Sequence, residues 1–554
     1  MTRLPVVATL LFAVLLTGAL AFGTARYKAA NACQQVVIAS SQEKTGMLSS
    51  FAAAYNRLDR QVAGRCVSVS VEQINSGDAE LALETGWVGQ TAPRPDVWSP
   101  ASSAWIALLR QSAPAQADKL LPNISASLFQ SPLVIGMPQP MADQLRYPTI
   151  RIGWSDIRDL IQDPQGWGRY GKSQWGPFRL GKTNPTVSTS GLHALIGTYY
   201  AASGGNLTAD IVAADPVRSY VAEIEKSVVH YGETASEFLL NLQNADKSGE
   251  AAVLDYVSAI ALEEKQLVDY NSGLVAGVQS AVPRTPLVAI YPKDGTPVAD
   301  HPYVVLRWSK VTAAALDFQN FLGEGDQRAA IDKNNFRSSG VGKSLGEHRF
   351  VQADQPVLVL QPPTGPGVLT AMIEGWKRAR KPARVLILID TAVDKGSLSE
   401  AISSLQTATS GFLGQDRVGI WTFPASQGQP ASYSTLLDVS SRGSPSTSLA
   451  GVRPTDGPSD LNGVLRKAVA EMVASYDANA INAVLVLELA PVDRPALDEA
   501  LASDLRRQDS SKFVRVFTVG PSSAVLRTIA LAARGTFYQR GSTFRFLNDV
   551  ISNF

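Results

Sequence analysis

The stretch Phe178-Arg-Leu-Gly-Lys-Thr-Asn-Pro-Thr-Val-Ser-Thr-Ser-Gly191 decides the fold class of this sequence. Its first four residues are typical of a short strand, and the apolar periodicity of Leu192 to Ala202 predicts a helix directly after it. The loop between them ends in three hydroxyl-bearing residues, which are common at helix starts because they accept bonds from free backbone N–H groups. A strand that leads through a polar loop into a helix predicts an α/β fold.

The same unit recurs on both sides of this stretch. Val36 to Ala39 reads as a strand and Glu43 to Leu58 as a helix, with Ser40 and Ser41 between them. Further along the chain, Val257 to Glu264 is expected to be helical, whereas Val385-Leu-Ile-Leu-Ile389 is a continuous apolar run typical of a central parallel strand. The sequence therefore predicts mainly parallel sheets covered by helices.

Length and composition set the broad class. The chain has 554 residues, of which 45% are hydrophobic and 18% charged, which predicts a folded protein of about two to four domains. The formal net charge is +1, so no nucleic-acid partner is expected.

The N-terminal residues 1–32 predict export. Leu4 to Ala25 is a stretch of 22 residues without a charge, and about 20 apolar residues suffice to span a bilayer core as a helix. A cleaved signal peptide is the alternative, with small-residue sites at Ala19-Leu-Ala21 and Ala30-Asn-Ala32. The length of the apolar run favours a single uncleaved membrane anchor, and both interpretations place the remaining chain outside the cytoplasm. In that oxidising environment the two cysteines, Cys33 and Cys66, predict a disulfide.

Two hydroxyl-rich helix starts are candidate binding sites. Ser40 and Ser41 follow the first strand, and Ser188, Thr189 and Ser190 precede the helix that starts near Leu192. The start of a helix carries a positive dipole end that suits an anion or a polar solute, and ligands of open α/β sheets bind at the carboxyl ends of the strands. Simple helix capping is the alternative for either cluster taken alone.

Residues 33–345 resemble the bacterial extracellular solute-binding proteins of the two-lobed kind, close to those that bind molybdate and sulfate. The resemblance rests on Thr183 to Gly191, Pro286-Leu-Val-Ala-Ile-Tyr-Pro-Lys-Asp-Gly-Thr296, His301-Pro-Tyr303, and Asp317 to Leu322. It implies two α/β lobes that enclose a ligand. The ligand-binding residues that it implies are Ser40, Ser41, Ser188, Thr189, Ser190, Asp255 and Tyr256.

Residues 346–381 are richer in proline and glycine and are expected to form a linker. The basic run Lys377-Arg-Ala-Arg-Lys381 lies at its end. A solvated hinge is the favoured interpretation of this run, and a lipid- or partner-binding patch is the alternative.

Residues 382–554 resemble a von Willebrand factor A domain, a doubly wound, Rossmann-like module. The resemblance rests on Val385 to Asp390, Asp416-Arg-Val-Gly-Ile-Trp-Thr-Phe423, Ala483 to Leu487, and Val514 to Gly520. It implies a protein partner. Members of that family often hold a divalent cation at the strand ends, where several oxygen ligands converge.

The cation motif is incomplete in this sequence. Asp390 is retained, but Ala392 stands where a hydroxyl ligand is expected and Leu489 where a late Asp is expected. The Thr position of the motif falls at Ser459, with Thr455 as the alternative. Asp390, Asp394, Ser459 and Asp460 are the residues that could still collect Mg²⁺ or Ca²⁺ in a non-standard way. The pattern favours a loop without a metal, and no other cofactor is expected.

Together these features predict a membrane-anchored, extracytoplasmic binding protein that captures a small polar or anionic solute and recruits a protein partner. The alternative is a cell-envelope adaptor whose two modules both bind proteins and whose solute site is vestigial. No enzyme activity is expected, because the sequence has no His-Glu-x-x-His motif and no P-loop. His193, next to the hydroxyl cluster, is expected on the helix surface rather than as a general base.

Overall fold

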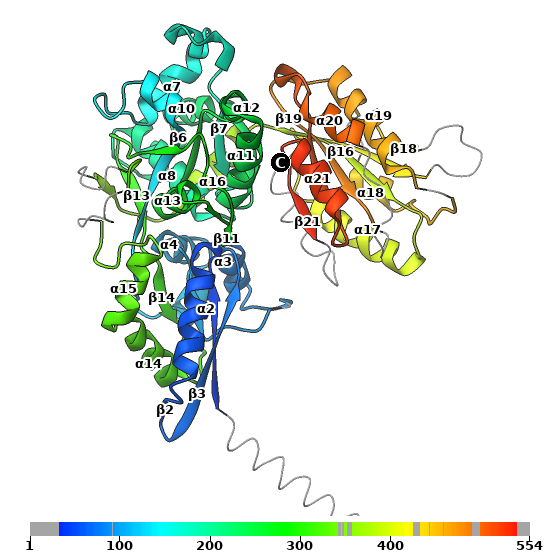
Figure 1. Cartoon of the computed structure of the whole chain (residues 1–554). Coiled ribbons are helices and arrows are strands. Elements are labelled where there is room, and N and C mark those ends of the chain that lie inside the picture. Colours follow the sequence, from blue (N-terminus) through cyan, green and yellow to red (C-terminus); the bar gives the residue numbers. More distant parts are fainter. Residues whose placement is uncertain are drawn as a thin grey trace, which may run out of the picture. The chain divides into compact units, whose positions relative to one another are not determined.

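The computed structural model describes residues 33–90, 92–341, 345, 348–351, 357–424, 433–441, 444–457, 459–489 and 499–539. The predicted membrane anchor at residues 1–32 lies outside the described residues. Among those described, no helix is long and apolar enough to cross a membrane. The chain divides into two compact units (Figure 1). The first holds the described residues up to Gln130 together with Asp300–Ser338, and the second holds Ser131–Ala299 and those from Ser339 on.

The first unit is built on one sheet with strand order β2-β3-β1-β4-β14-β5. Its three central strands β3, β1 and β4 run parallel because each is followed by a helix that returns the chain to the same edge. Its strands are β1 (Gln34–Ser40), β2 (Gln61–Val62), β3 (Arg65–Gln73), β4 (Val97–Ser99), β5 (Ala126–Ser127) and β14 (Pro302–Val305). Its helices are α2 (Gln42–Asn56), α3 (Ser76–Glu84), α4 (Ser103–Ser112), α5 (Pro114–Leu120), α14 (Thr312–Leu322) and α15 (Gly325–Lys333).

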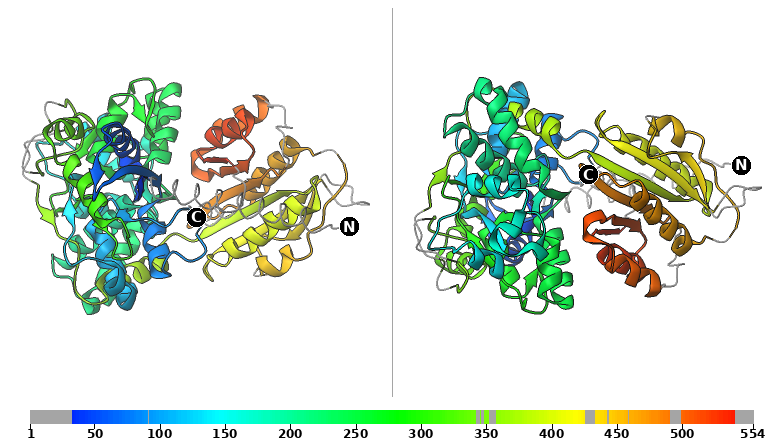
Figure 2. Two further views of the ribbon diagram at one scale, coloured as in Figure 1. Left: turned by 90° about the horizontal axis from the view of Figure 1, so that it is seen from below. Right: turned by 90° about the horizontal axis from the view of Figure 1, so that it is seen from above.

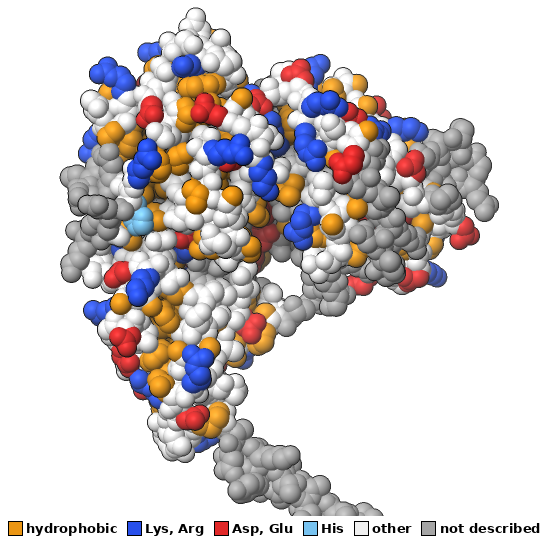
Figure 3. Space-filling view, viewed as in Figure 1, with side chains coloured by type: hydrophobic (Ala, Val, Ile, Leu, Met, Phe, Trp, Pro, Cys, Tyr) orange, Lys and Arg blue, Asp and Glu red, His pale blue; other side chains and the backbone are white. Residues whose placement is uncertain are grey.

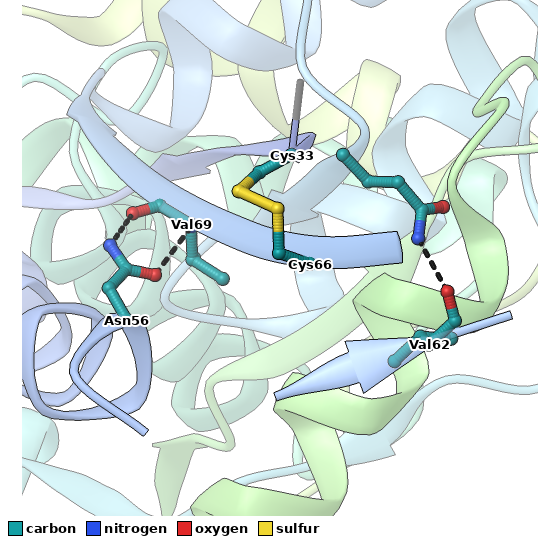
Figure 4. The surroundings of a disulfide bond; sticks show 6 residues. Cys33, Asn56, Val62, Cys66 and Val69 are labelled. Atoms are coloured by element: carbon teal, nitrogen blue, oxygen red, sulfur yellow. Dashed lines mark hydrogen bonds between the residues drawn. A yellow bond between two sulfur atoms is a disulfide. The ribbon is translucent and has the colours of Figure 1, made fainter. Parts of the chain in front are cut away.

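The predicted disulfide joins the start of this unit to β3. Cys33 and Cys66 are bonded across 33 residues of sequence, and their Cα atoms lie 4.6 Å apart (Figure 4). Asn56, at the end of α2, fastens the helix to the same strand: its amide donates to the Val69 carbonyl at 3.0 Å and its Oδ1 accepts from the Val69 N–H at 2.8 Å. In the chain-entropy model a closed loop of this length stabilises the fold by about 3–4 kcal/mol.

The second unit contains a sheet with strand order β15-β13-β6-β9-β7-β8, and β12 pairs with β6. Strands β8, β7 and β9 are parallel, and β6 runs antiparallel to β9. The strands are β6 (Ser131–Pro138), β7 (Leu180–Thr183), β8 (Val228–Gly232), β9 (Ala259–Glu263), β12 (Leu287–Ile290), β13 (Thr296–Ala299) and β15 (Val359–Leu360), and a hairpin pairs β10 (Leu274–Val275) with β11 (Val278–Gln279). The helices are α6 (Gln139–Gln144), α7 (Trp154–Gln162), α8 (Thr189–Ser203), α9 (Ala209–Ala213), α10 (Asp215–Lys226), α11 (Ala235–Ser248), α12 (Glu250–Tyr256) and α13 (Glu264–Asn271).

One predicted helix is wrong. The sequence predicts a helix from Val257 to Glu264, but β9 (Ala259–Glu263) occupies most of this segment and α13 begins only at Glu264. All five residues of β9 are buried, and a short continuous apolar run of this kind suits a central strand with both faces covered.

The predicted linker also differs from the structure. Within residues 346–381, β15 adds to the sheet by pairing with β13, and α16 (Val368–Ala379) packs against α9 and α10. Leu369, Met372 and Trp376 form the buried face of α16. The hinge interpretation of the basic run fails for Arg380, whose guanidinium lies 2.5 Å from the Asp416 carboxylate and is nearly buried. That carboxylate orders the start of the next sheet by accepting the Ala383 N–H at 2.7 Å.

The last sheet of the second unit has strand order β18-β17-β16-β19-β20-β21, so the chain starts in the middle and winds outward on both sides. Central strand β16 contains the predicted run from Val385 to Ile389, and all eight of its residues are buried because helices cover both faces of the sheet (Figure 2). The strands are β16 (Ala383–Asp390), β17 (Arg417–Phe423), β18 (Ser434–Leu437), β19 (Ile481–Leu487), β20 (Arg515–Gly520) and β21 (Phe537–Gln539). The helices are α17 (Lys395–Thr409), α18 (Pro445–Leu449), α19 (Leu461–Ala474), α20 (Glu499–Arg506) and α21 (Ala524–Ala532).

The surface agrees with the near-zero net charge. On the face shown in Figure 3, side chains of Lys and Arg lie among those of Asp and Glu, with apolar side chains between them. No single sign of charge dominates this face, so the charged features that matter are local.

Candidate functional site

The carboxyl edge of the first unit brings together serine residues from two neighbouring parallel strands, β1 and β4. Ser40 at the end of β1 lies opposite Ser99 at the end of β4. The Ser41 N–H donates to the Ser99 carbonyl at 3.3 Å, and the Ile74 N–H donates to the Ser40 carbonyl at 2.9 Å. Ser40, Ser41 and Ser99 are all buried at this edge.

Ser41 does not cap its helix. It is the N-cap residue of α2, but its hydroxyl accepts no bond from the first turn and donates instead to Glu43. The Glu43 carboxylate lies 3.6 Å from Nδ1 of His301, and Nζ of Lys44 lies 3.3 Å from the same nitrogen. At the first-unit edge, Ser41, Glu43, Lys44 and His301 therefore form one connected network of charged and hydroxyl groups.

Sequence reasoning missed the charged members of this network. Lys44 is fully buried and donates to the Pro100 carbonyl at 2.7 Å, and His301 is also fully buried. Their position in the sequence could have indicated two of them, because Glu43 and Lys44 occupy the first turn of the helix that follows Ser40 and Ser41.

The start of α8 in the second unit is more open. Ser188 is its N-cap residue with an extended backbone, yet its side chain makes no capping hydrogen bond. The first N–H of the helix to bond back is that of Leu192, which donates to the Ser188 carbonyl at 3.0 Å. The hydroxyl of Thr183, at the end of β7, is buried and has no hydrogen-bond partner among the described residues. The Ser188 hydroxyl is therefore not used to cap α8.

The neighbouring strand end shows what a self-satisfied helix start looks like. Helix α13, which follows β9, is closed by a capping box between Glu263 and Gln266, and the Glu263 N–H donates to the Gln266 side chain at 3.2 Å. Strands β7 and β9 are paired and parallel, so the two helix starts lie at one edge of the sheet. Of these two described helix starts, α13 is closed by its capping box and α8 is not capped by its N-cap side chain.

A glycine holds α8 close to the strand that precedes it. A Cβ at Gly191 would lie 2.3 Å from the Thr183 carbonyl oxygen and 2.8 Å from the backbone of Asn184. No other residue fits this approach without a backbone shift. The side chain of His193, two residues on, is fully buried, so the expectation of a surface position for it is wrong. Burial lowers the pKa of His193 to about 3.

Asp255 and Tyr256 do not join the hydroxyl cluster. The Asp255 carboxylate lies 2.6 Å from a guanidinium nitrogen of Arg534 and 3.5 Å from one of Arg179, which directly precedes β7. Tyr256 is fully buried in the core of this unit. Both therefore lie at the amino end of β7, whereas Ser188 to Ser190 follow its carboxyl end. The resemblance implied both residues as ligand contacts, but it did not say at which end of the sheet α12 lies.

The residues predicted as cation ligands, Asp390, Asp394, Ser459 and Asp460, form the acidic loop at the carboxyl edge of the last sheet. Only some of their side-chain oxygens accept hydrogen bonds within the protein. Oδ1 of Asp390 accepts the Ala392 N–H at 2.9 Å. Its Oδ2 and the hydroxyl of Ser459 are buried and have no hydrogen-bond partner within the part of the chain that the structure describes. Asp394 and Asp460 serve as helix caps, accepting from Ser397 N–H and Gly463 N–H at 2.9 Å each. Among the described residues, the carboxylates of Asp390, Asp394 and Asp460 do not gather within 4.8 Å of one another.

Comparison with known proteins defines the class. Residues 36–337, more than half of the chain, match the family model of bacterial extracellular solute-binding proteins, and the chain belongs to this family. The family consists of binding proteins that act outside the cytoplasm, in agreement with the export prediction.

Individual proteins are also similar to this chain. The uncharacterized protein Rv1836c of Mycobacterium tuberculosis is 25% identical over 511 residues, which cover 88% of this chain and 71% of the relative. The sulfate-binding protein SubI of Mycobacterium tuberculosis is similar with a TM-score of 0.36 and 15% identity, over 55% of this chain and 86% of SubI. A periplasmic thiamin-binding protein is similar with a TM-score of 0.43 and 13% identity, over 63% of this chain and 96% of that protein.

Proposed function

We propose that this solute-binding protein captures a small polar or anionic solute, and that the start of α8 makes its main polar contacts. The observation that carries the proposal is the uncommitted α8 start: Ser188 does not cap the helix, and Thr183 has a buried hydroxyl without a partner among the described residues. Buried polar groups are nearly always hydrogen-bonded, and the first N–H groups of a helix attract negative charge. A solute with acceptor oxygens would satisfy both.

The direct test is calorimetric titration of the full chain with sulfate, molybdate, phosphate and a panel of small polar metabolites. We expect at least one of these to bind. Replacing Ser188→Ala together with Ser190→Ala should weaken that binding by about tenfold or more, because each lost charge-assisted hydrogen bond is worth about 1.5–3 kcal/mol. Ser403→Ala, at an exposed position on α17, is the matched control and should leave the affinity unchanged. Silence across the panel, or full affinity in the double variant, would contradict the proposal.

We further propose that residues 1–32 anchor the protein in the cell membrane and that residues 382–554 recruit a protein partner as a von Willebrand factor A-like module. The strand order β18-β17-β16-β19-β20-β21 supports the second part, as does the position of Asp390 at the carboxyl end of its central strand. The incomplete acidic loop favours partner binding without a required Mg²⁺ or Ca²⁺. A partner that remains bound after Ser188, Thr189 and Ser190 are all replaced by Ala, in a chain that binds no solute before replacement, would favour the adaptor alternative.

A further inference from the structure

A cavity of about 1090 Å³ lies in the second unit, at the amino edge of its last sheet. Lys381 precedes β16, and Arg515 is the first residue of β20, so both come from the edge opposite to Asp390. The other wall comes from the segment before β7, from β8 and from the end of α12. This cavity is thus separate from the start of α8 and from the acidic loop.

The charges that line the cavity are unbalanced. Its cations are Arg179, Lys226, Lys381, Arg515 and Arg534, and its carboxylates are Glu223 and Asp255. Both carboxylates are already engaged, since Asp255 pairs with Arg534 and Arg179, and Glu223 lies 2.5 Å from Nε of Arg158. Among the described residues, no carboxylate comes within ion-pair distance of Arg515 or Lys381.

Arg515 is the most buried of the cavity's cations that have no carboxylate partner among the described residues. Its side chain is only 7% exposed, and it donates to two neutral carbonyls, those of Val229 at 3.3 Å and Arg534 at 2.9 Å. Buried charges are normally paired with an opposite charge, because removing an ion from water is unfavourable.

The pKa values of Arg515 and Lys381 are both lowered by their surroundings. Desolvation, reinforced by the nearby guanidinium of Arg534, lowers the pKa of Arg515 to about 10. Desolvation and then the charge of Arg515 lower the pKa of Lys381 to about 8. A bound anion would oppose both effects.

We propose that this cavity binds a phosphorylated small molecule, with the phosphate against Arg515 and Lys381 and the organic part against Tyr476 and Phe513. A guanidinium matches two phosphate oxygens at once, and a phosphomonoester carries close to two negative charges at neutral pH. The volume exceeds what inorganic phosphate alone would fill, and the two half-buried aromatic rings offer an apolar surface for the remainder.

The test uses phenyl phosphate as the probe, titrated calorimetrically into the full chain at pH 7. The chain carries Ser188→Ala and Ser190→Ala, so that the proposed solute site contributes little. We expect binding that Lys381→Gln weakens about tenfold and that Lys381→Arg preserves. Arg515→Gln should abolish binding in a chain that still unfolds cooperatively; Lys381→Gln tests the same site at a half-buried position if Arg515→Gln fails to fold. Lys395→Gln, an exposed lysine on α17, is the matched control.

Two results would overturn the proposal. One is binding of phenyl phosphate by the unsubstituted chain that disappears with the serine pair, which would assign the probe to the start of α8. The other is an affinity unchanged by Lys381→Gln. If the unsubstituted chain binds no member of the solute panel but phenyl phosphate still binds and depends on Lys381, the proposed function is contradicted and this inference stands.

Discussion

The helix starts of α2 and α8 carry nearly the same sequence signal but have different chemistry. Each follows a parallel strand, and in each a serine occupies the N-cap position without capping the helix through its side chain. At α2 the hydroxyl of Ser41 is consumed by Glu43 within a network that includes Lys44 and His301. At α8 no charged side chain takes that place, and the Thr183 hydroxyl lacks a partner among the described residues.

This difference shows that a Ser-rich helix start indicates a place in the fold and not yet a binding site. What decides is whether neighbouring side chains already satisfy the hydroxyls. By this criterion the α8 start is the stronger candidate for solute contacts, and the α2 start is an internally balanced polar core. The two can be distinguished by substitutions that should act in opposite directions.

The largest expected effect concerns the glycine in the first turn of α8. Gly191→Ala should lower the free energy of unfolding by about 3 kcal/mol, because the new Cβ would meet the Thr183 carbonyl at 2.3 Å. The corresponding change in α2, Gly46→Ala, meets nothing within 4 Å at an exposed position and should stabilise by about 0.5–1 kcal/mol. Thermal unfolding of the full chain, with hydrogen exchange to localise the effect, measures both. Equal effects of the two substitutions would mean that the starts are packed alike.

The next effect depends on pH and concerns His193 of α8. Its pKa is lowered to about 3 by burial, against an ordinary value of about 6.5, so the folded state binds fewer protons than the unfolded state. Its neutral form therefore supports stability above pH 6.5, and this support is lost as pH falls from about 6.5 towards 3. Between pH 7 and pH 5 the expected loss is about 2 kcal/mol.

Slower exchange of the α8 amides at pH 7 than at pH 5, after correction for the intrinsic pH dependence of exchange, would report this loss. His193→Gln should flatten the dependence by about one proton. His230, whose pKa burial also lowers, continues to titrate in that variant and sets the remaining slope. A full pH dependence in His193→Gln would show that His193 does not contribute.

The sequence was most informative where one physical explanation accounts for a pattern. The apolar run from Val385 to Ile389 is central strand β16, because only a strand covered on both faces tolerates such a run. The two cysteines form the predicted disulfide, because two thiols in an exported chain meet an oxidising environment.

The failures share a different cause, which is contact between segments far apart in sequence. The sequence predicts a solvated Arg380, but its guanidinium is paired with Asp416, which lies 36 residues later in the chain. The sequence predicts a surface position for His193, whereas all of the first eleven residues of α8 are buried. Asp255 was placed with the solute contacts, yet its partner Arg534 lies 279 residues away. Local periodicity carries no information about such partners.

The smallest expected effect is a change in the free energy of unfolding that has opposite signs at the two helix starts. Ser40 donates to the Ser41 carbonyl at 3.2 Å and accepts from the Thr45 hydroxyl at 3.2 Å, so Ser40→Ala should destabilise by about 1 kcal/mol. Thr183→Val replaces a buried hydroxyl without a described partner by a methyl group of similar size. It should leave stability unchanged or raise it by up to about 1 kcal/mol, because no hydrogen bond is lost and a desolvated polar group is removed. Urea denaturation measures both changes, and solute titration should show weaker binding in the stable Thr183→Val chain. A destabilised Thr183→Val chain would mean that this hydroxyl is satisfied within the protein, and the α8 start would then be as closed as that of α2.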